Sequence, residues 1–229
     1  MRYNWLLFDA DGTLFDYDAA EAKALATTYA EGDVEYHPDY LETYRRINAE
    51  MWLDFERGTM TQARLKTERF ESLFAATDVD ADPALFSSLY LKNLARRTDL
   101  IDGAEKVLAR LSTSARGLLI TNGLAAVQRP RFSSSAILRY FSGFVISEEV
   151  GSAKPAPEIF DAAFAEMGHP DKAGVLMIGD SLSSDIKGGN DFGIDTCWYN
   201  PGGASPDPEI EPTYEIADLQ ELLAVTESD

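Results

Sequence analysis

Runs of consecutive apolar residues recur along the chain, and segments with helical periodicity separate them. The four clearest runs cover residues 5–8, 117–120, 144–146 and 175–178. Buried strands that alternate with helices are typical of a parallel sheet with helices packed on both faces. The pattern therefore predicts an α/β fold built on a parallel sheet.

Two more short runs near the end of the chain predict further strands. They cover residues 196–199 and 213–216, and a loop rich in Pro and Gly connects them. A helical segment from residue 217 to about 224 follows the second run. We expect this helix to close the fold.

A long stretch with helical periodicity separates the first strand from the next. Its apolar residues mark two amphipathic faces, one formed by Leu41, Tyr44, Met51 and Phe55 and the other by Phe70, Leu73 and Phe74. A crossover between parallel strands needs only about a dozen residues. We therefore expect residues 17–98 to form an inserted α-helical cap domain, and residues 1–16 and 99–229 to form the core domain.

The composition predicts a packed globule and excludes several classes of partner. The 229 residues are 45% hydrophobic, and 20 basic against 39 acidic side chains give a net charge of −19. This charge repels phosphate backbones and anionic lipids, so we expect neither a nucleic acid polymer nor a membrane as a partner. A small substrate is compatible with the charge, and the oligomeric state stays open.

Cysteine content and apolar run length indicate the compartment. Cys197 is the single cysteine, so the chain cannot form an intrachain disulfide, and the sequence has no Cys/His array for structural zinc. No apolar run is long enough for a signal-peptide core or a membrane-spanning helix. These features predict a cytoplasmic protein.

Two pairs of aspartates follow predicted strands. Asp9 and Asp11 come after the first strand, and Asp180 and Asp185 come after the strand at 175–178. In isolation, each pair is also explained by capping of a turn or helix. Because ligands of parallel sheets bind at the carboxyl ends of strands, the four acids should lie close together. They would repel one another unless a divalent cation neutralised them, which favours a Mg²⁺ site.

Thr121, Asn122 and Lys154 supply groups that suit an anion. Thr121 and Asn122 follow the strand at 117–120 and offer a hydroxyl, an amide and the first N–H groups of a helix. Lys154 is one of only seven lysines in the chain. A helix N-cap and a solvated surface charge are the alternative interpretations. Taken with the aspartates, the three residues predict a phosphate site.

These motifs, in this order, resemble the four motifs of the haloacid dehalogenase superfamily of phosphohydrolases. They are Asp-Ala-Asp-Gly-Thr at 9–13, Thr-Asn-Gly at 121–123, Lys-Pro at 154–155 and Gly-Asp-Ser-x-x-x-Asp at 179–185. The resemblance covers essentially the whole chain. It implies a Rossmann-like core with a helical cap inserted after the first motif, as in the first cap class of the superfamily.

The resemblance also implies catalytic roles. Asp9 would be the nucleophile that attacks phosphorus, and Asp11 would be the general acid and base. Thr121 and Asn122 would bind the phosphate, and Lys154 would orient Asp9 and the phosphoryl group.

The same resemblance implies a magnesium cofactor. Asp9, the carbonyl of Asp11 and Asp180 would hold the Mg²⁺ ion, and Asp185 would be a further ligand or lie just behind these ligands. The true dehalogenases of the superfamily lack the second acid of the first motif. Asp11 therefore favours phosphate chemistry over halide displacement.

Further strings resemble the branch of the superfamily that hydrolyses pyrimidine nucleoside monophosphates. They include Phe-Asp-Ala-Asp at 8–11, Met-Trp-Leu-Asp-Phe at 51–55, Ser-Glu-Glu-Val-Gly at 147–151 and Asp-Thr-Cys-Trp at 195–198. Asn48 and Trp52 are four residues apart and share a helix face. One hypothesis is that Trp52 packs against a base or sugar that Asn48 hydrogen-bonds, and the other is that Trp52 belongs to the cap core.

The sequence thus predicts a Mg²⁺-dependent phosphomonoester hydrolase that acts through a phosphoaspartate on a small phosphorylated substrate, most simply a 5′-nucleotidase. Phosphatase or phosphomutase activity on sugar phosphates is the alternative within the superfamily. A phospho-receiver or nucleotide-binding module without hydrolytic activity is the alternative from another class. Asp11, which would speed hydrolysis, and the long insertion count against a receiver.

Overall fold

The computed structural model describes residues 2–227, which fold into two compact units. The core unit comprises the residues up to Tyr17, Asp99–Ala125 and the residues from Ser135 onward. The helical unit comprises Asp18–Thr98 together with Ala126–Ser134. The boundaries predicted from the sequence place 126–134 in the core domain, so they differ from these units at that stretch.

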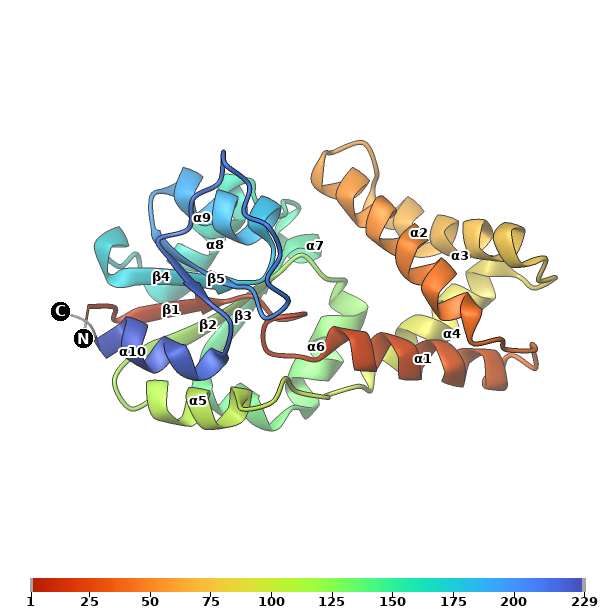
Figure 1. Cartoon of the computed structure of the whole chain (residues 1–229), viewed down its shortest axis with the longest axis horizontal. Helices are drawn as coiled ribbons and strands as arrows, with labels where there is room; N and C mark the ends of the chain where they lie inside the picture. Colours follow the sequence, from red (N-terminus) through yellow and green to blue (C-terminus); the bar gives the residue numbers. More distant parts are fainter. Residues whose placement is uncertain (1, 228–229) are drawn as a thin grey trace. The chain divides into compact units, whose positions relative to one another are not determined.

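A six-stranded parallel sheet with the order β3-β2-β1-β4-β5-β6 forms the centre of the core unit (Figure 1). The strands are β1 (Trp5–Phe8), β2 (Arg116–Thr121), β3 (Phe141–Ile146), β4 (Val175–Gly179), β5 (Asp195–Tyr199) and β6 (Tyr214–Ile216). Each of the six apolar runs forms one of these strands. The predicted α/β fold with a parallel sheet is therefore confirmed.

Helices of the core unit cover both faces of the sheet, with α8 and α9 on one face and α5 and α10 on the other (Figure 1). The helices are α5 (Ala104–Leu111), α7 (Ser147–Val150), α8 (Pro157–Met167), α9 (Lys187–Phe192) and α10 (Leu222–Glu227). Short 3₁₀ turns are η1 (Ala136–Tyr140), η2 (Lys172–Gly174) and η4 (Leu219–Glu221), and η3 (Leu182–Ile186) is a π turn. The helix α6 (Ala125–Ser134) begins in the core unit and continues into the helical unit.

Alternate residues of β1 pack against the two helical layers, as the period of a strand requires. Leu7 lies in an apolar cluster with Phe160 of α8 and Phe192 of α9. Leu6 lies beside Leu108 of α5 on the opposite face. Burial on both faces explains why the run is apolar throughout.

The register of the sheet brings the polar strand ends together. Phe8 of β1 is paired with Leu119 of β2 and with Ile178 of β4. Asp9 and Asp180, which follow these positions along β1 and β4, therefore lie at the same edge of the sheet. Ligands of open parallel sheets bind at this edge.

The helical unit is an inserted bundle with an aromatic interior. Its helices include α1 (Tyr17–Glu31), α2 (Asp39–Glu56), α3 (Gln62–Thr77) and α4 (Pro83–Ala95). Tyr29, Tyr44, Phe70, Phe86 and Tyr90 are buried, and their ring centroids lie 4.9 to 5.5 Å apart in successive pairs. Of the two predicted amphipathic faces, the Phe70 face is buried, whereas Leu41, Met51 and Phe55 are only half-buried. Within residues 2–227, no helix is both long and apolar enough to cross a lipid bilayer.

The closing helix differs from the prediction at both ends. It starts with η4 at Leu219 and not at 217, because the Asp218 side chain accepts a hydrogen bond from the Gln220 N–H. The Glu221 carboxylate accepts hydrogen bonds from the N–H groups of Ala217 and Asp218 and completes a capping box. The helix α10 then continues to Glu227.

Candidate active site

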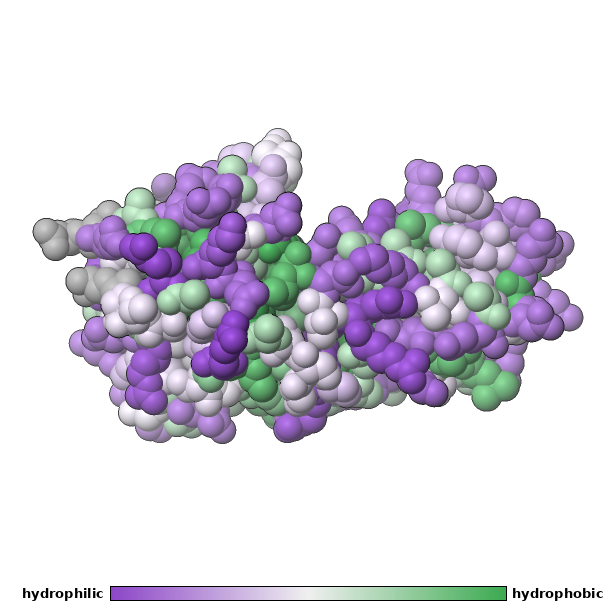
Figure 2. Space-filling view, turned by 90° about the horizontal axis from the view of Figure 1, so that it is seen from below, coloured by the Kyte–Doolittle hydropathy of each residue, from purple (hydrophilic) through white to green (hydrophobic). Residues whose placement is uncertain are grey.

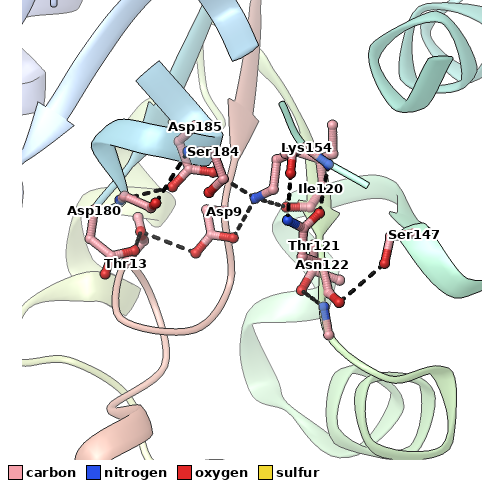
Figure 3. Close-up of polar contacts among 12 residues, drawn as sticks. Asp9, Thr13, Ile120, Thr121, Asn122, Ser147, Lys154, Asp180, Ser184 and Asp185 are labelled. Atoms are coloured by element: carbon pink, nitrogen blue, oxygen red, sulfur yellow. Dashed lines mark hydrogen bonds and ion pairs between the residues drawn. The ribbon is translucent and has the colours of Figure 1, made fainter. Parts of the chain in front are cut away.

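Three aspartates form a cluster at the carboxyl ends of β1 and β4. Asp9 follows β1 directly, Asp180 follows β4, and Asp185 lies in the turn η3. One carboxylate oxygen of each residue lies within 4.8 Å of the other two (Figure 3). The sheet register and the tight turn after β4 thus bring together acids that are far apart in sequence.

Lys154 is the cation inside this cluster. Its side chain is buried, and its Nζ atom lies 2.6 Å from Asp9 Oδ1 and 2.7 Å from Asp185 Oδ1 (Figure 3). Nζ also donates a hydrogen bond to the carbonyl of Ile120 at 3.0 Å. Burial alone would lower the pKa of Lys154, but the carboxylates of Asp185 and Asp9 outweigh that effect and raise it. The ammonium group is therefore charged at neutral pH.

Burial, and then the neighbouring carboxylates, raise the pKa values of two aspartates. Burial raises the pKa of Asp9 despite the opposing charge of Lys154, and Asp185 and Asp180 raise it further. Part of Asp180 reaches solvent, but Thr13 and Asp185 lie against its carboxylate. Burial and the charge of Asp185 together raise the pKa of Asp180 to about 7. The cluster would carry more negative charge than Lys154 balances whenever at least two of the three aspartates are ionised.

The donor set fits a hard divalent cation. Three carboxylates and one ammonium leave two negative charges when all four groups are ionised. Among the described residues, Asp185 Oδ1 accepts no hydrogen bond, although it lies close to the Lys154 ammonium. Carboxylate oxygens at this spacing are the ligands that Mg²⁺ prefers.

Two glycines make the close approach of the carboxylates possible. A Cβ atom on Gly179 would lie 2.2 Å from Asp185 Oδ2, so Asp185 can fold back over the end of β4 only because this side chain is absent. A Cβ atom on Gly12 would lie 2.5 Å from Asp180 Oδ2, and the φ angle of Gly12 is +86°. Both the space and the left-handed backbone therefore require glycine at position 12.

Thr13 and Trp198 also contact the cluster, and the sequence motifs predicted a role for neither. The Thr13 hydroxyl lies 3.3 Å from Asp9 Oδ2 and 3.2 Å from Asp180 Oδ1 (Figure 3). Because a hydroxyl has one proton, it can donate a hydrogen bond to one of these carboxylates at a time. Trp198 Nε1 donates a hydrogen bond to the Asp180 carbonyl at 2.9 Å. The position of Thr13, four residues after Asp9 in a tight turn, was the available signal for its contact. No local signal places Trp198 beside Asp180, because their contact depends on the pairing of β4 with β5.

Asp11 lies next to the cluster in sequence, but its carboxylate is not one of the three grouped oxygens. Asp11 is half-buried and pairs with Phe15 in an isolated bridge. The prediction that it contributes its carbonyl to a metal site, and its carboxyl to proton transfer, stays a prediction.

Thr121 and Asn122 lie at the end of β2, beside Lys154. The Thr121 hydroxyl accepts a hydrogen bond from the Gly123 N–H at 3.0 Å. The Asn122 side chain forms two hydrogen bonds with the backbone of Lys154: Oδ1 accepts from its N–H and Nδ2 donates to its carbonyl, each at 2.8 Å (Figure 3). The Asn122 amide therefore holds the Lys154 backbone, a contact that the sequence analysis did not foresee.

Asn48 and Trp52 lie on α2 in the helical unit. Asn48 is buried, and its Nδ2 donates to Glu21 Oε1 at 3.4 Å while its Oδ1 accepts from Arg69 Nη1 at 3.1 Å. Trp52 is half-buried and lies edge-on to Phe55, with ring centroids 5.6 Å apart. The contacts of Asn48 favour a structural role for its amide. Substrate binding by either residue stays a prediction.

Comparison with known proteins finds relatives over nearly the whole length of the chain. Residues 3–193 match the family model of haloacid dehalogenase-like hydrolases. The chain is 35% identical to the pyrimidine 5′-nucleotidase YjjG of Escherichia coli over 97% of each chain. It is 36% identical to the pyrimidine 5′-nucleotidase PynA of Streptococcus pneumoniae over 97% of this chain and 94% of PynA. The crystal structure of the HAD-hydrolase YfnB of Bacillus subtilis, which contains bound magnesium, matches with a TM-score of 0.94 and 37% identity over 100% of both chains. The chain therefore belongs to the family of haloacid dehalogenase-like hydrolases.

Proposed function

We propose that this hydrolase is a Mg²⁺-dependent phosphomonoesterase that acts on nucleoside monophosphates, with pyrimidine nucleotides preferred. The observation that carries the proposal is the group of Asp9, Asp180, Asp185 and Lys154 at one edge of the sheet, in which all but Asp180 are buried. It combines a candidate nucleophile, a cation and a set of oxygen ligands for a metal. Phosphoryl transfer requires little more than these groups, because most of its catalysis is positioning and charge stabilisation.

In the first step, a carboxylate oxygen of Asp9 attacks phosphorus and the bond from phosphorus to the leaving oxygen breaks. Lys154, 2.6 Å from Asp9 Oδ1, orients the carboxylate, and its positive charge favours the ionised form that attacks. Asp11 gives its proton to the leaving alkoxide, which departs as the free alcohol. The product of this step is a phosphoaspartate at residue 9.

In the second step, water attacks the phosphorus of the phosphoaspartate and the bond to Asp9 breaks. Asp11, now ionised, accepts a proton from the attacking water. Inorganic phosphate leaves, and both carboxyl groups return to their starting states. Thr121 and the backbone N–H groups after β2 bind the phosphoryl oxygens during both steps.

The acid cluster would hold the Mg²⁺ ion. When bound between Asp9, Asp180 and Asp185, Mg²⁺ supplies positive charge that offsets the charge of the nucleophile and of the phosphoryl oxygens. The magnesium bound in the YfnB crystal structure supports this choice of metal.

The nucleotide preference rests on the relatives. YjjG and PynA, the two pyrimidine 5′-nucleotidases, match the chain at 35% and 36% identity over nearly its whole length. Sugar phosphates are the second candidate class, since the N-acylneuraminate-9-phosphatase of Mus musculus is 27% identical over 99% of the chain. A phosphate group on a small molecule is common to both classes.

A phosphate-release screen with Mg²⁺ tests the proposal. The panel contains pyrimidine and purine nucleoside monophosphates, sugar phosphates and other small phosphoesters, and Asp9→Asn is the blank. We expect the highest kcat/KM with a pyrimidine nucleoside monophosphate and no release by Asp9→Asn. Preference for a sugar phosphate would remove the nucleotidase proposal, and unchanged release by Asp9→Asn would remove Asp9 as the nucleophile.

A further inference from the structure

The loop between β2 and α6 is held in place from the loop that follows β3. The Ser147 hydroxyl donates a hydrogen bond to the carbonyl of Asn122 at 3.1 Å (Figure 3). Glu148 Oε2 accepts a hydrogen bond from the N–H of Ala125, the first residue of α6, at 2.8 Å. Two consecutive residues therefore fix the backbone of residues 122–125 at both ends.

The sheet register explains why these residues meet. Thr121, the last residue of β2, is paired with Ile146, the last residue of β3. Ser147 and Glu148 follow Ile146, so they leave the sheet beside the loop that follows Thr121. Ser147 is almost fully buried at 2% exposure, so little water competes for its hydrogen bond.

The same loop determines the position of Lys154. Asn122 receives the Ser147 hydrogen bond on its backbone and forms two hydrogen bonds with the Lys154 backbone through its side chain. The Lys154 ammonium lies 2.6 Å from Asp9. A displacement of Asn122 would therefore move both the phosphate-binding loop and the cation that orients the nucleophile.

We propose that Ser147 and Glu148 are positioning residues for phosphoryl transfer: they set the loop of Thr121 and Asn122 and, through Asn122, the backbone of Lys154. The proposal rests on the proposed phosphatase function. Besides accepting the hydrogen bond, the Glu148 carboxylate stabilises α6 electrostatically, because it places a negative charge at the positive N-terminal end of the helix. Neither residue needs to touch the substrate.

Two substitutions test the proposal, and each has a matched control. Glu148→Ala removes the acceptor of the Ala125 N–H, whereas Glu148→Gln keeps an oxygen that can accept it. Ser147→Ala removes the donor to Asn122. Glu149→Ala makes the same change as Glu148→Ala in the same helix, at a side chain that is exposed.

We expect Glu148→Ala and Ser147→Ala each to lower kcat/KM by about tenfold, the effect of losing one good hydrogen bond. Inorganic phosphate, the product inhibitor, should bind more weakly by a similar factor. The Mg²⁺ dissociation constant, measured by calorimetry, should change by less than about twofold, because the three aspartates are untouched. Glu148→Gln should recover most of the loss, and Glu149→Ala should stay within about twofold of the wild type.

Two results would overturn the inference. One is that phosphate affinity and kcat/KM stay at wild-type values in Glu148→Ala and Ser147→Ala. The other is that Mg²⁺ affinity and melting temperature fall together with activity, which would indicate a general loss of folding. A wild-type chain that releases no phosphate from any phosphoester would instead overturn the proposed function, so the two failures are distinguishable.

Discussion

Lys154 is the residue on which the charge balance of the acid cluster depends. Its ammonium group donates hydrogen bonds to Asp9 and to the carbonyl of Ile120, and it forms an ion pair with Asp185. A buried charge is stable only when it is paired, and removal of one partner leaves the others uncompensated. Lys154, the cation proposed to orient the nucleophile, therefore also stabilises the fold.

Replacing Lys154 by Gln should reduce both stability and activity. Without metal, the free energy of unfolding should fall by about 3 kcal/mol, because Asp9 and Asp185 lose their buried counter-charge. The kcat value should fall by at least about 100-fold. Denaturant titration in EDTA measures the first effect, and steady-state kinetics measures the second.

Lys187→Gln is the control for this substitution. Lys187 pairs with Asp191 on the surface, where its side chain is 47% exposed, so stability should change by less than about 0.5 kcal/mol. Equal effects of the two substitutions would contradict the account of Lys154.

The raised pKa of Asp180 predicts that Mg²⁺ affinity depends on pH. With a pKa of about 7, most Asp180 carboxyl groups are protonated at pH 6 and must lose that proton before they can bind a metal. The Mg²⁺ dissociation constant should therefore be about tenfold larger at pH 6 than at pH 8. Calorimetry in buffers of different ionisation enthalpy would measure the affinity and the protons released.

The raised pKa of Asp180 also predicts how the stability of the metal-free protein changes with pH. A carboxyl whose pKa is higher in the folded than in the unfolded chain favours folding at low pH, so the metal-free protein should lose stability as pH rises from about 4 to about 7. Asp180→Asn should flatten both pH dependences. Equal Mg²⁺ affinity of the wild type at pH 6 and pH 8 would show that Asp180 is already ionised.

At the scale of elements, the central strands β1 and β4 were predictable because every residue of each is buried. Each apolar run in the sequence forms one strand of the sheet. Their order in the sheet brings Asp9, Asp180 and Lys154 together, and the ordered motifs anticipated this grouping. The contacts of Asn122 were not predictable, because an Asn after a strand suits a phosphate and a backbone carbonyl equally well. Which partner it takes depends on the path of the loop that carries Lys154.

Asn48 links three helices of the helical unit, and its replacement should affect stability first. It lies on α2, and its side chain contacts Glu21 of α1 and Arg69 of α3, both buried. Asn48→Ala should lower the free energy of unfolding by about 2 kcal/mol, because two buried charged groups lose a partner. The order of preference among nucleotide substrates should not change.

If the half-buried Trp52 contacts the base, Trp52→Ala should affect substrate preference more than stability, the opposite of Asn48→Ala. It should then change the order of preference among nucleotides while stability falls less than in Asn48→Ala. Kinetics with uridine, cytidine and adenosine monophosphates would separate the two residues. An unchanged order in Trp52→Ala would assign Trp52 to the interior of the helical unit.

The charge of the whole molecule is unevenly distributed between the two units. Twelve of the 20 basic residues lie in the helical unit, and none follows Lys187. Hydrophilic side chains spread over the visible face of the helical unit, with apolar side chains between them (Figure 2). The core unit therefore carries most of the net charge of −19, although it contains the proposed phosphate site. Affinity for phosphate at the proposed site would therefore have to come from Lys154, the bound Mg²⁺ ion and backbone N–H groups.

The negative charge of the protein predicts an unusual dependence of activity on salt. A negative protein slows the approach of a nucleotide dianion, and salt screens that repulsion over about 10 Å at 0.1 M. With Mg²⁺ saturating, kcat/KM should rise as KCl increases from about 20 to about 150 mM, while kcat stays nearly constant. A steep fall of kcat/KM with salt would show that the field of the site itself dominates.

The central claim is that Asp9 becomes phosphorylated during turnover, and chemical trapping tests it most directly. The Asp11→Asn variant with p-nitrophenyl phosphate and Mg²⁺ should accumulate the intermediate, because the nitrophenolate leaves without a proton but water then attacks without a base. Acid quenching, reduction with borohydride and peptide mass spectrometry should find homoserine at position 9 and none in the Asp9→Asn/Asp11→Asn double variant. An unmodified Asp9 in a variant that still releases nitrophenol in a burst, or homoserine at another aspartate, would contradict the account.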